Sequence, residues 1–454
     1  MELNFSELLN AVQGEVIIKG DNIEFNNLCT DTRKIEKNNI FLALNGENFN
    51  GNKYVKVAFE QGASIAIVDD ILVDLEEVKN LGTVIKVKNS YDALLNLAKY
   101  YRNKLGIKVV GVTGSTGKTS TKDLVAAFLS GKYKVFKTKG NFNNHIGLPL
   151  MILQLDSSVD IAVLELGMSN LGEIHTLADC ARPDIALITN IGLSHIENLK
   201  TRENILKAKM EITDFFDKDN ILIVNGEDDY LPEVSSDIYH VIKTGYDNNF
   251  DYKAEDIKLT ENTTSFVLND GKEKHEFDLP MVGAHNVLNA LLGIAASKAL
   301  GVTYEEMIKG LDNIEATSMR LEFVNGDGFT IINDCYNASP SSMKAALDVL
   351  KNHKGNRKIA ILGSMNELGH EAENAHREVG EYARDTADIL VTTGDYKESY
   401  KLGFNKEDIK IYDTKEDIIE NIKNVIAKGD VILVKASRGI KFEEIVKALE
   451  SIKI

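Results

Sequence analysis

The chain has 454 residues, and its 69 acidic and 52 basic side chains give a formal net charge of -17 at pH 7. This surplus of negative charge argues against a nucleic-acid-binding protein or one held on an anionic membrane, because both need a basic surface. The three cysteines, Cys29, Cys180 and Cys335, are too widely spaced for a zinc ribbon or a paired disulfide motif. The length favours about three domains in one globular protein.

Neither a signal peptide nor a membrane-spanning segment is predicted. Residues 1–10 are acidic and contain no cationic segment followed by an apolar one. No apolar run reaches the roughly 18 residues that a spanning helix needs. Together with the unpaired cysteines, which suit a reducing compartment, these features lead us to expect a cytoplasmic enzyme.

Short strands, turns and one helix are expected in residues 1–83. Apolar runs indicate strands at 40–44 and 65–68, with a helix at 55–61. The apolar residues of 91–104 then recur at helical spacing, which predicts a second helix.

Strands and helices alternate through residues 84–313. Buried-type strands are expected at 107–112, 161–166, 185–189 and 221–224, and helices at 119–129 and 286–300. A polar stretch at 252–278 is expected to form antiparallel strands. Such alternation is typical of a mostly parallel sheet covered by helices.

The same α/β alternation returns in residues 314–454. Strands are expected at 330–333, 358–362, 389–392 and 431–434, and helices at 341–350, 372–384 and 442–449. The predicted fold class is therefore α/β, with three domains at 1–83, 84–313 and 314–454. The first is small, the second holds a mostly parallel sheet, and the third is Rossmann-like.

A glycine-rich loop, G-S-T-G-K-T, joins the predicted strand 107–112 to the helix at 119–129. Its glycines allow left-handed geometry, so that successive N–H groups can face phosphate oxygens at a helix N-terminus. The strict phosphate-loop pattern has Gly where Val112 stands, so the match is to a shorter variant. A plain strand–helix turn with a surface lysine is the less favoured alternative. The predicted ATP-contacting residues are Gly114, Ser115, Thr116, Gly117, Lys118, Thr119 and Ser120.

Three further residues are candidates for a metal site at the same sheet edge. Glu165 ends an apolar strand, where an unpaired carboxylate is costly to bury and where parallel sheets gather ligands. A Glu at a frayed strand end is the alternative. His195 follows the strand at 185–189, and Lys209 falls on a predicted helix. Taken alone, a structural histidine and a solvated lysine would be the simpler interpretations of these two residues.

Together these motifs resemble the Mur ligase superfamily. The segments VTGSTGKTST, ELGMSNLGEI, TNIGLSHIE and AKMEI occur in the family's order. The resemblance implies that Thr119 and Glu165 bind one Mg²⁺, and that His195 and a carbamylated Lys209 attend a second. Carbamylation converts a cation into an anionic ligand and requires a lowered lysine pKa. Lys207 fits the motif less well than Lys209.

The resemblance also implies the nucleotide contacts. Asn286 and Asn289, in GAHNVLNAL, share a helix face and match the family's adenine-contacting segment, although Asn286 could instead cap the helix. Arg320 matches an arginine near the ATP phosphates. Asp334 matches an acidic residue of the C-terminal domain that closes over the nucleotide.

Two regions bear on the branch of the family. The N-terminal one resembles both the third-residue-adding ligase and the D-alanyl-D-alanine-adding ligase, and the C-terminal one separates them in favour of the branch that adds the dipeptide. The segment after residue 30 resembles a UDP-binding domain, which implies that Thr30, Asp31, Thr32 and Arg33 lie near the UDP-sugar; a turn with surface charge is the alternative. The runs DCYNASPSSM and LGSMNELG resemble that branch's C-terminal motifs. Ser339 and Ser364 depart from them, standing where Asn and Asp are usual.

The remaining substrate-binding predictions concern polar side chains. The resemblance implies substrate contacts for Tyr336 and Asn337. It also implies that Asn141 and Asn144 line the channel for the acceptor substrate. The alternative is an ordinary loop of Asn and Gly residues with no role in binding.

The implied reaction joins D-alanyl-D-alanine to a UDP-N-acetylmuramoyl-tripeptide through an acyl phosphate, with ATP as co-substrate and two Mg²⁺. It belongs to cytoplasmic peptidoglycan precursor synthesis, and we expect a monomer with no nucleic-acid or membrane partner. The alternatives are a third-residue-adding ligase, a folylpolyglutamate synthase or, less favoured, a phosphate-loop ATPase regulator.

Overall fold

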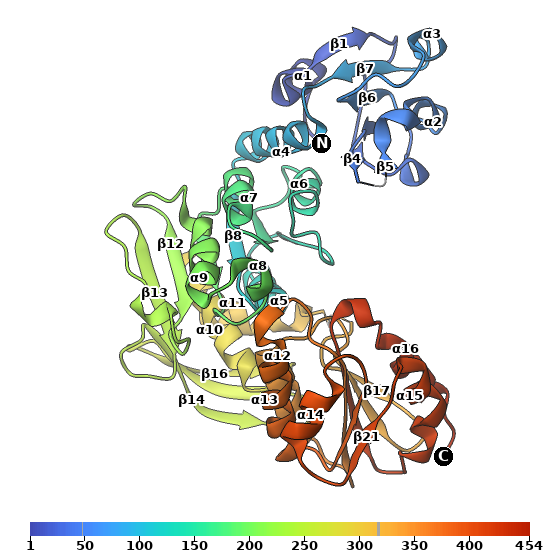
Figure 1. Cartoon of the computed structure of the whole chain (residues 1–454). Coiled ribbons are helices and arrows are strands. Elements are labelled where there is room, and N and C mark those ends of the chain that lie inside the picture. The colour runs from blue at the N-terminus through green and yellow to red at the C-terminus, as the bar shows by residue number, and fades with distance from the viewer. Residues whose placement is uncertain (48, 316–317) are drawn as a thin grey trace.

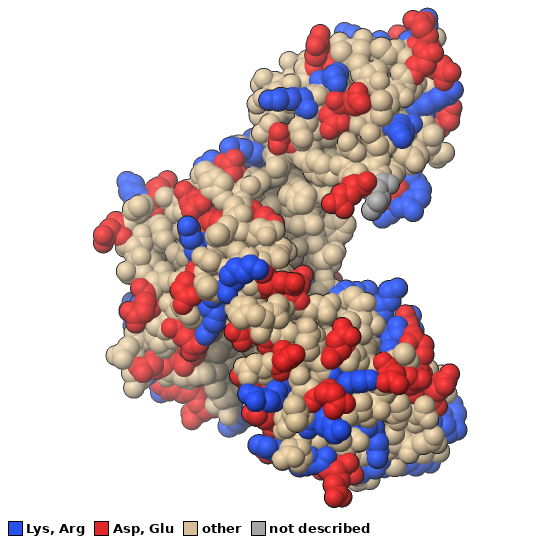
Figure 2. Space-filling view, viewed as in Figure 1, with Lys and Arg blue, Asp and Glu red and all other residues tan. Residues whose placement is uncertain are grey.

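The computed structural model describes residues 1–47, 49–315 and 318–454. Three sheets follow one another along the chain, each with helices packed on it (Figure 1). The N-terminal part lies at one end of the molecule, and the C-terminal part lies against the central part. Acidic and basic side chains are interspersed over the face seen in Figure 2, and a deep indentation separates the two outer parts.

The N-terminal sheet has five strands in the order β1-β7-β6-β3-β2. Only the β1–β7 pair is antiparallel. The strands are β1 (Glu15–Ile18), β2 (Leu28–Cys29), β3 (Ile40–Leu42), β6 (Ile65–Val68) and β7 (Thr83–Lys86), beside a hairpin of β4 (Asn45–Gly46) and β5 (Phe49–Asn50). The helices are α1 (Phe5–Val12), α2 (Val55–Glu60) and α3 (Leu75–Val78). Only α2 was predicted, because α1 and α3 are too short to show a clear period.

Helix α4 (Ser90–Leu105) leads from this sheet into the central one. Asn89 caps its first turn by accepting hydrogen bonds from two backbone N–H groups, and Gly106 ends it in the left-handed region. Its buried residues include Leu94 and Tyr101, whose hydroxyl donates to the carbonyl of Leu155. Helix α4 therefore ties the two parts of the chain together.

The central sheet has nine strands in the order β16-β15-β14-β13-β12-β11-β8-β10-β9. All neighbouring strands are parallel except β14–β15 and β15–β16, which are the antiparallel pairs predicted for this stretch. The strands are β8 (Lys108–Thr113), β9 (Val135–Lys137), β10 (Ile161–Glu165), β11 (Ile185–Ile188), β12 (Ile221–Asn225), β13 (His240–Gly245), β14 (Tyr252–Leu259), β15 (Thr264–Asn269) and β16 (Lys274–Leu279). Strand β8 lies between β10 and β11, where the strand order reverses and open α/β sheets bind ligands.

Helices cover both faces of this sheet because alternate side chains of its strands point to opposite faces. Val110 and Val112 pack with α5 (Lys118–Ser130), α10 (His285–Ala299) and α11 (Tyr304–Gly310). Val109 packs on the other face. That face carries α4, α6 (Gly147–Ile152), α7 (Glu173–Ala181) and α9 (Arg202–Met210), and α8 (Ile196–Leu199) precedes α9.

The C-terminal sheet has the order β17-β18-β22-β19-β20-β21, with only β17 antiparallel. The strands are β17 (Glu322–Asn325), β18 (Thr330–Asn333), β19 (Lys358–Leu362), β20 (Ile389–Thr392), β21 (Ile409–Ile411) and β22 (Val431–Lys435). Helices α12 (Pro340–Asn352), α13 (Ala372–Arg384) and α14 (Lys397–Phe404) pack on one face, and α15 (Lys415–Asn421) and α16 (Glu443–Ser451) on the other.

The predicted α/β fold class, with three units and a mostly parallel central sheet, is confirmed. Strand β7 belongs to the first sheet, so we propose that the first domain extends to Lys86 rather than ending at residue 83. The second boundary, near 313, stays a prediction. Within the described residues, no helix is long and apolar enough to cross a membrane.

Candidate active site

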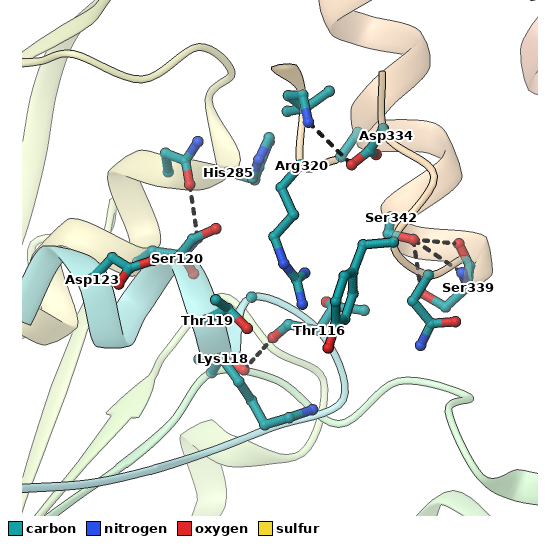
Figure 3. A pocket seen from close by; sticks show the side chains of 18 of the residues that line it. Thr116, Lys118, Thr119, Ser120, Asp123, His285, Arg320, Asp334, Ser339 and Ser342 are labelled. Atoms are coloured by element: carbon teal, nitrogen blue, oxygen red, sulfur yellow. Dashed lines mark hydrogen bonds between the residues drawn. The ribbon is translucent and has the colours of Figure 1, made fainter. Parts of the chain in front are cut away.

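A cavity of about 930 Å³ lies where the carboxyl edge of the central sheet meets the C-terminal part. The phosphate loop and the ends of β10 and β11 form one wall, and the start of α10 forms another. The segments around Arg320 and Tyr336 complete it from the C-terminal side (Figure 3). The cavity therefore draws on elements more than 200 residues apart in sequence, from Ser115 to Lys435.

The glycine-rich loop has the left-handed geometry expected of a phosphate loop. Gly114 has φ +152° and Gly117, at the start of α5, has φ +79°. A Cβ on Gly114 would come within 1.7 Å of Thr189 Oγ1, so no larger residue fits there. Lys118 Nζ donates to the Gly114 carbonyl at 2.8 Å, which folds the lysine back over the loop. Burial lowers the pKa of Lys118.

The segment after β11 holds the phosphate loop in place through hydrogen bonds, a role that was not predicted from the sequence. Asn190 accepts hydrogen bonds from the N–H of Ser115, through its carbonyl, and from the N–H of Thr116, through Oδ1, both at 3.0 Å. The N–H of Gly192 donates to Ser115 Oγ at 2.9 Å. Polar residues directly after a buried strand could have marked this segment as functional. Its contact with the phosphate loop could not be predicted from sequence spacing.

Glu165 and Thr119 meet at the mouth of the loop. Thr119 Oγ1 donates to Glu165 Oε2 at 3.0 Å, and Asn143 Nδ2 donates to Glu165 Oε1 at 2.8 Å. Glu165 is only 3% exposed, so its charge is held by these polar neighbours rather than by water. Asn143, which was not predicted, reaches the carboxylate, whereas Asn144 lines the cavity and caps the turn before α6.

The oxygen donors of Thr119 and Glu165 fit Mg²⁺, which prefers carboxylate and hydroxyl oxygens and keeps water or phosphate oxygens in its remaining positions. Within the described residues, no group of three or more His, Cys, Asp and Glu side chains forms a ready-made metal cage. An ion here would therefore depend on the phosphates of a bound nucleotide for several of its ligands.

His195 lies on the cavity wall as the residue that precedes α8, with φ +65°. Its Nδ1 is 2.5 Å from Oε2 of Glu367, a residue of the C-terminal part. This contact lowers the pKa of the Glu367 carboxyl. Sequence reasoning singled out His195 but not its partner.

Lys209 points into the protein from α9 and is 1% exposed, whereas the competing Lys207 is exposed. In the described part of the chain, no hydrogen-bond or ion-pair partner reaches Lys209 Nζ. Burial, with a smaller contribution from the nearby charge of Lys118, lowers the pKa of Lys209 well below its ordinary value. Such surroundings favour the neutral amine over the ammonium form.

Arg320 reaches into the cavity from the C-terminal side, towards Thr119 and Lys118 (Figure 3). Its guanidinium carbon lies 4.2 Å from the centre of the Tyr336 ring. Its Nε has no hydrogen-bond acceptor among the described residues, although it is buried. Two cations with free donors, Lys118 and Arg320, thus face one cavity in a strongly acidic protein, which indicates a site for an anionic ligand.

Asp334 forms a 2.5 Å ion pair with Lys435, a buried lysine at the end of β22. Lys435 Nζ also donates to the carbonyl of Asn337 at 2.8 Å. It therefore fixes the 334–337 segment against the sheet. Sequence reasoning missed Lys435, although a lysine that ends an apolar strand is a signal of the same kind as Glu165.

The start of α10 supplies the two predicted asparagines. The residue before the helix is Ala284, so Asn286 is not its cap; its Nδ2 donates instead to the carbonyl of Val282 at 2.9 Å. Asn289 Nδ2 donates to Asn286 Oδ1 at 3.0 Å and lies over Gly117. Burial lowers the pKa of the neighbouring His285 to about 4.

Some predicted residues lie elsewhere. Asn141 is exposed and is not among the described residues that line the cavity, and neither are residues 30–33 of the N-terminal part. There, Asp31 accepts two hydrogen bonds from the Arg33 guanidinium, both at 2.8 Å. Tyr336, Asn337 and Ser339 do line the cavity, and Ser339 caps α12 through Ser342.

Comparison with known proteins places the chain in a family. Its residues 112–297 match the Mur ligase middle domain, residues 319–438 the Mur ligase glutamate ligase domain, and residues 24–102 the Mur ligase catalytic domain model. A UDP-N-acetylmuramoyl-tripeptide–D-alanyl-D-alanine ligase of Bacillus subtilis is 43% identical over 429 residues, covering 93% of this chain and 92% of the relative. The Escherichia coli enzyme of the same name is 33% identical over 458 residues, covering 99% of both.

Solved structures agree with this assignment. MurF from Acinetobacter baumannii superposes with a TM-score of 0.90 at 30% identity, covering 99% of both chains. MurF ligase from Thermotoga maritima, solved in complex with ADP, gives a TM-score of 0.82 at 29% identity, covering 94% of this chain and 97% of that one. The cavity lined by the phosphate loop, Glu165 and Arg320 thus lies in a chain that belongs to the Mur ligase family.

Proposed function

We propose that this protein is an ATP-dependent ligase that adds D-alanyl-D-alanine to a UDP-N-acetylmuramoyl-tripeptide, in the cytoplasmic synthesis of peptidoglycan precursors. Relatives with this name cover almost the whole chain at 43% and 33% identity. The third-residue and folate ligases with a similar fold are only 14% identical, which speaks for shared architecture alone.

One observation carries the proposal at the level of chemistry. Lys118 and Arg320 approach the same cavity from different parts of the chain, beside the Thr119–Glu165 pair. The buried Arg320 Nε has no acceptor among the described residues. A carboxylate can attack a triphosphate only if their mutual repulsion is offset, and preorganised cations in a water-poor site do this best. The arrangement supports phosphoryl transfer to an anionic acceptor.

The proposed reaction has two steps. A terminal carboxylate oxygen of the tripeptide attacks the γ-phosphorus of ATP, the bond to the β–γ bridging oxygen breaks, and ADP leaves with that oxygen. The dipeptide amine then attacks the acyl carbon, loses a proton, and expels inorganic phosphate as the amide forms. Lys118 and Arg320 would hold the transferred phosphoryl group in both steps, and N–H groups of residues 114–119 would hold the other phosphates.

We further propose that Thr119 and Glu165 hold one Mg²⁺, and that His195 and Lys209 attend a second. When bound, Mg²⁺ would offset phosphate charge and orient the triphosphate. Lys209 is suited to carbamylation, because burial favours the neutral amine that can add CO₂, and no partner among the described residues reaches its Nζ. Lys209 is not among the described residues that line the cavity but lies near Lys118, and the resulting carbamate would supply anionic oxygens there.

Substrate placement follows from the arrangement of the three parts. We propose that ATP lies between α5, α10 and Arg320, with Asn286 and Asn289 near the adenine and Asp334 near the nucleotide. The UDP end of the substrate would lie by residues 30–33, and the peptide end would reach the cavity. Tyr336, Asn337 and Asn144 would then contact the dipeptide or the tripeptide terminus, and the protein would act as a monomer.

A phosphate-release assay with an acceptor panel tests this proposal. The protein is incubated with ATP, Mg²⁺ and the UDP-N-acetylmuramoyl-tripeptide, and D-alanyl-D-alanine, D-alanine, L-lysine or meso-diaminopimelate is added. We expect phosphate release only with the dipeptide. Turnover with a single amino acid but not the dipeptide would reassign the protein to another branch of the family. Release without any acceptor would favour a phosphate-loop ATPase.

A further inference from the structure

A carboxylate from the C-terminal part contacts the Nδ1 atom of the His195 ring. Glu367 Oε2 is 2.5 Å from His195 Nδ1, a close contact in which the N–H and the oxygen are not aligned as a hydrogen bond. His195 lines the cavity, whereas Glu367 is not among the described residues that do so. Nδ1 is buried against Glu367, so Nε2 is the nitrogen left for a ligand in the cavity.

The backbone on both sides of this contact is strained. His195 has φ +65° and Glu367 has φ +63°, in a region that residues other than glycine rarely adopt. The two residues come from different sheets and face each other. Strained backbone of this kind persists only when the surroundings enforce it, and it gathers at functional sites.

The loop that carries Glu367 is held firmly without the help of that side chain. The N–H of Met365 donates to His376 Nε2, and the N–H of Asn366 donates to Ser437 Oγ, both at 2.9 Å. The carbonyl of Glu367 accepts from the N–H of Glu197 at 3.1 Å, two residues beyond His195. Since the Glu367 side chain is 52% exposed, its contact with His195 adds little to folding stability.

We propose that Glu367 is a positioning residue: it fixes the His195 ring with the proton on Nδ1, so that the Nε2 lone pair faces the cavity as a metal ligand. Histidines that bind metals through one nitrogen usually donate the other N–H to a carboxylate or carbonyl, which sets both tautomer and orientation. Here the orienting carboxylate comes from another part of the chain. His195 is thus correctly oriented only when the C-terminal part lies against the central part.

This inference deepens the proposed function and rests on His195 attending a metal ion. It predicts that the orientation of the His195 ring depends on the contact between the C-terminal part and the central part. When the two parts separate, the ring loses its partner, so the site loses a preorganised metal ligand in addition to Arg320 and Asp334, which also come from the C-terminal part.

The test uses three single variants of the full chain. Glu367→Asn suits the left-handed backbone but is too short to reach the histidine. Glu367→Gln keeps the length and an acceptor oxygen. Glu373→Gln is the matched control, because Glu373 is exposed, lies on the nearby helix α13, and has no hydrogen bond or ion pair among the described residues. Urea unfolding first shows that all three are folded.

Two readouts follow, and neither depends on turnover. Nitrogen-15 NMR of labelled histidine, with the His195 signals identified by their loss in His195→Gln, reports which ring nitrogen carries the proton. Calorimetry with Mn²⁺ and ADP reports metal affinity. We expect a Nδ1-protonated ring in the wild type and in Glu373→Gln. In Glu367→Asn we expect a mixed tautomer population and an affinity at least about 10-fold weaker, with intermediate behaviour in Glu367→Gln.

Unchanged His195 signals and unchanged Mn²⁺ affinity in Glu367→Asn would overturn the inference. An equal loss in Glu373→Gln would also overturn it, because the effect would then be one of general surface charge. These outcomes are separate from the fate of the proposed function. The acceptor panel could fail with D-alanyl-D-alanine while Glu367 still controls the His195 ring, and the reverse could also occur.

Discussion

Thr119 Oγ1 and Glu165 Oε2 are joined by a 3.0 Å hydrogen bond between the first turn of α5 and the end of β10. Because β10 is the parallel neighbour of β8, the carboxylate comes to the mouth of the phosphate loop without any special distortion. Both side chains are buried, and the hydrogen bond fixes one against the other. Preorganisation of this kind avoids reorganisation at the moment of reaction, which is where catalytic advantage arises.

Replacing Glu165 by Gln should keep the shape of the pair but remove its charge. We expect ligation to fall on the order of 100-fold, with a higher Mg²⁺ concentration needed for half-maximal rate, because a neutral amide is a poorer ligand. Phosphate release across a Mg²⁺ titration measures both effects. Glu276→Gln, at an exposed site on β16, is the matched control and should behave like the wild type. Equal Mg²⁺ dependence in the two variants would remove Glu165 from the metal site.

Lys209→Ala should abolish most activity if a carbamate is needed. Added formate or acetate should restore part of it, since a small carboxylate can occupy the space of the lost group. Lys207→Ala is the control, two residues away on the same helix and exposed. Full activity of Lys209→Ala, or equal stimulation of both variants by the added acids, would contradict the carbamate proposal.

Arg320→Lys should behave as a severe change although it keeps the charge. Lysine lacks the planar group that stacks on Tyr336 and the multiple donors that can hold two phosphate oxygens. We expect kcat to fall by at least about 10-fold, with a smaller change in the KM for the dipeptide. Steady-state kinetics separate these two effects. An effect on the dipeptide KM alone would place Arg320 at the acceptor instead.

Acidification should destabilise the protein through His376, which is fully buried and supports the loop of Glu367. Its Nε2 accepts the Met365 N–H, so the ring must be neutral, and burial lowers its pKa from about 6.5 to about 4. The unfolded chain takes up a proton below pH 6.5 and the folded protein does so only near pH 4. Stability is therefore full above pH 6.5 and falls between these values, by about 2 kcal/mol at pH 5.

Urea unfolding at pH 7.5 and pH 5 measures this contribution. His376→Gln removes the titrating group, so its loss of stability on acidification should be smaller than that of the wild type by about the same 2 kcal/mol. Other histidines titrate in both proteins and cancel in the comparison. An identical pH dependence in the two proteins would show that His376 is not held neutral.

The repeating elements were predictable because burial imposes regular patterns. The strands 65–68, 330–333, 358–362 and 389–392 and the helix 372–384 were predicted with the bounds that the structure has. These segments have clear apolar periods and charged or glycine boundaries. The antiparallel strands at 252–279 were likewise expected from their polar composition.

Contacts between distant segments were not predictable. The family resemblance pointed to Asn141 and Asn144, but Asn143 is the one that reaches Glu165. Nothing in the local sequence of either residue states that Glu367 will meet His195. Such pairings depend on how three separately folded sheets pack together, which is information that periodicity and motif spacing do not contain.

The central step of the proposed mechanism is the attack of a carboxylate on ATP in the cavity that Lys118 and Arg320 line. The direct test labels both oxygens of the tripeptide's terminal carboxylate with ¹⁸O and follows the label after ligation of D-alanyl-D-alanine. An acyl phosphate passes one carboxylate oxygen to the released phosphate, so mass spectrometry should find one ¹⁸O in each phosphate and one in the new amide. Unlabelled phosphate alongside ligated product would contradict the mechanism.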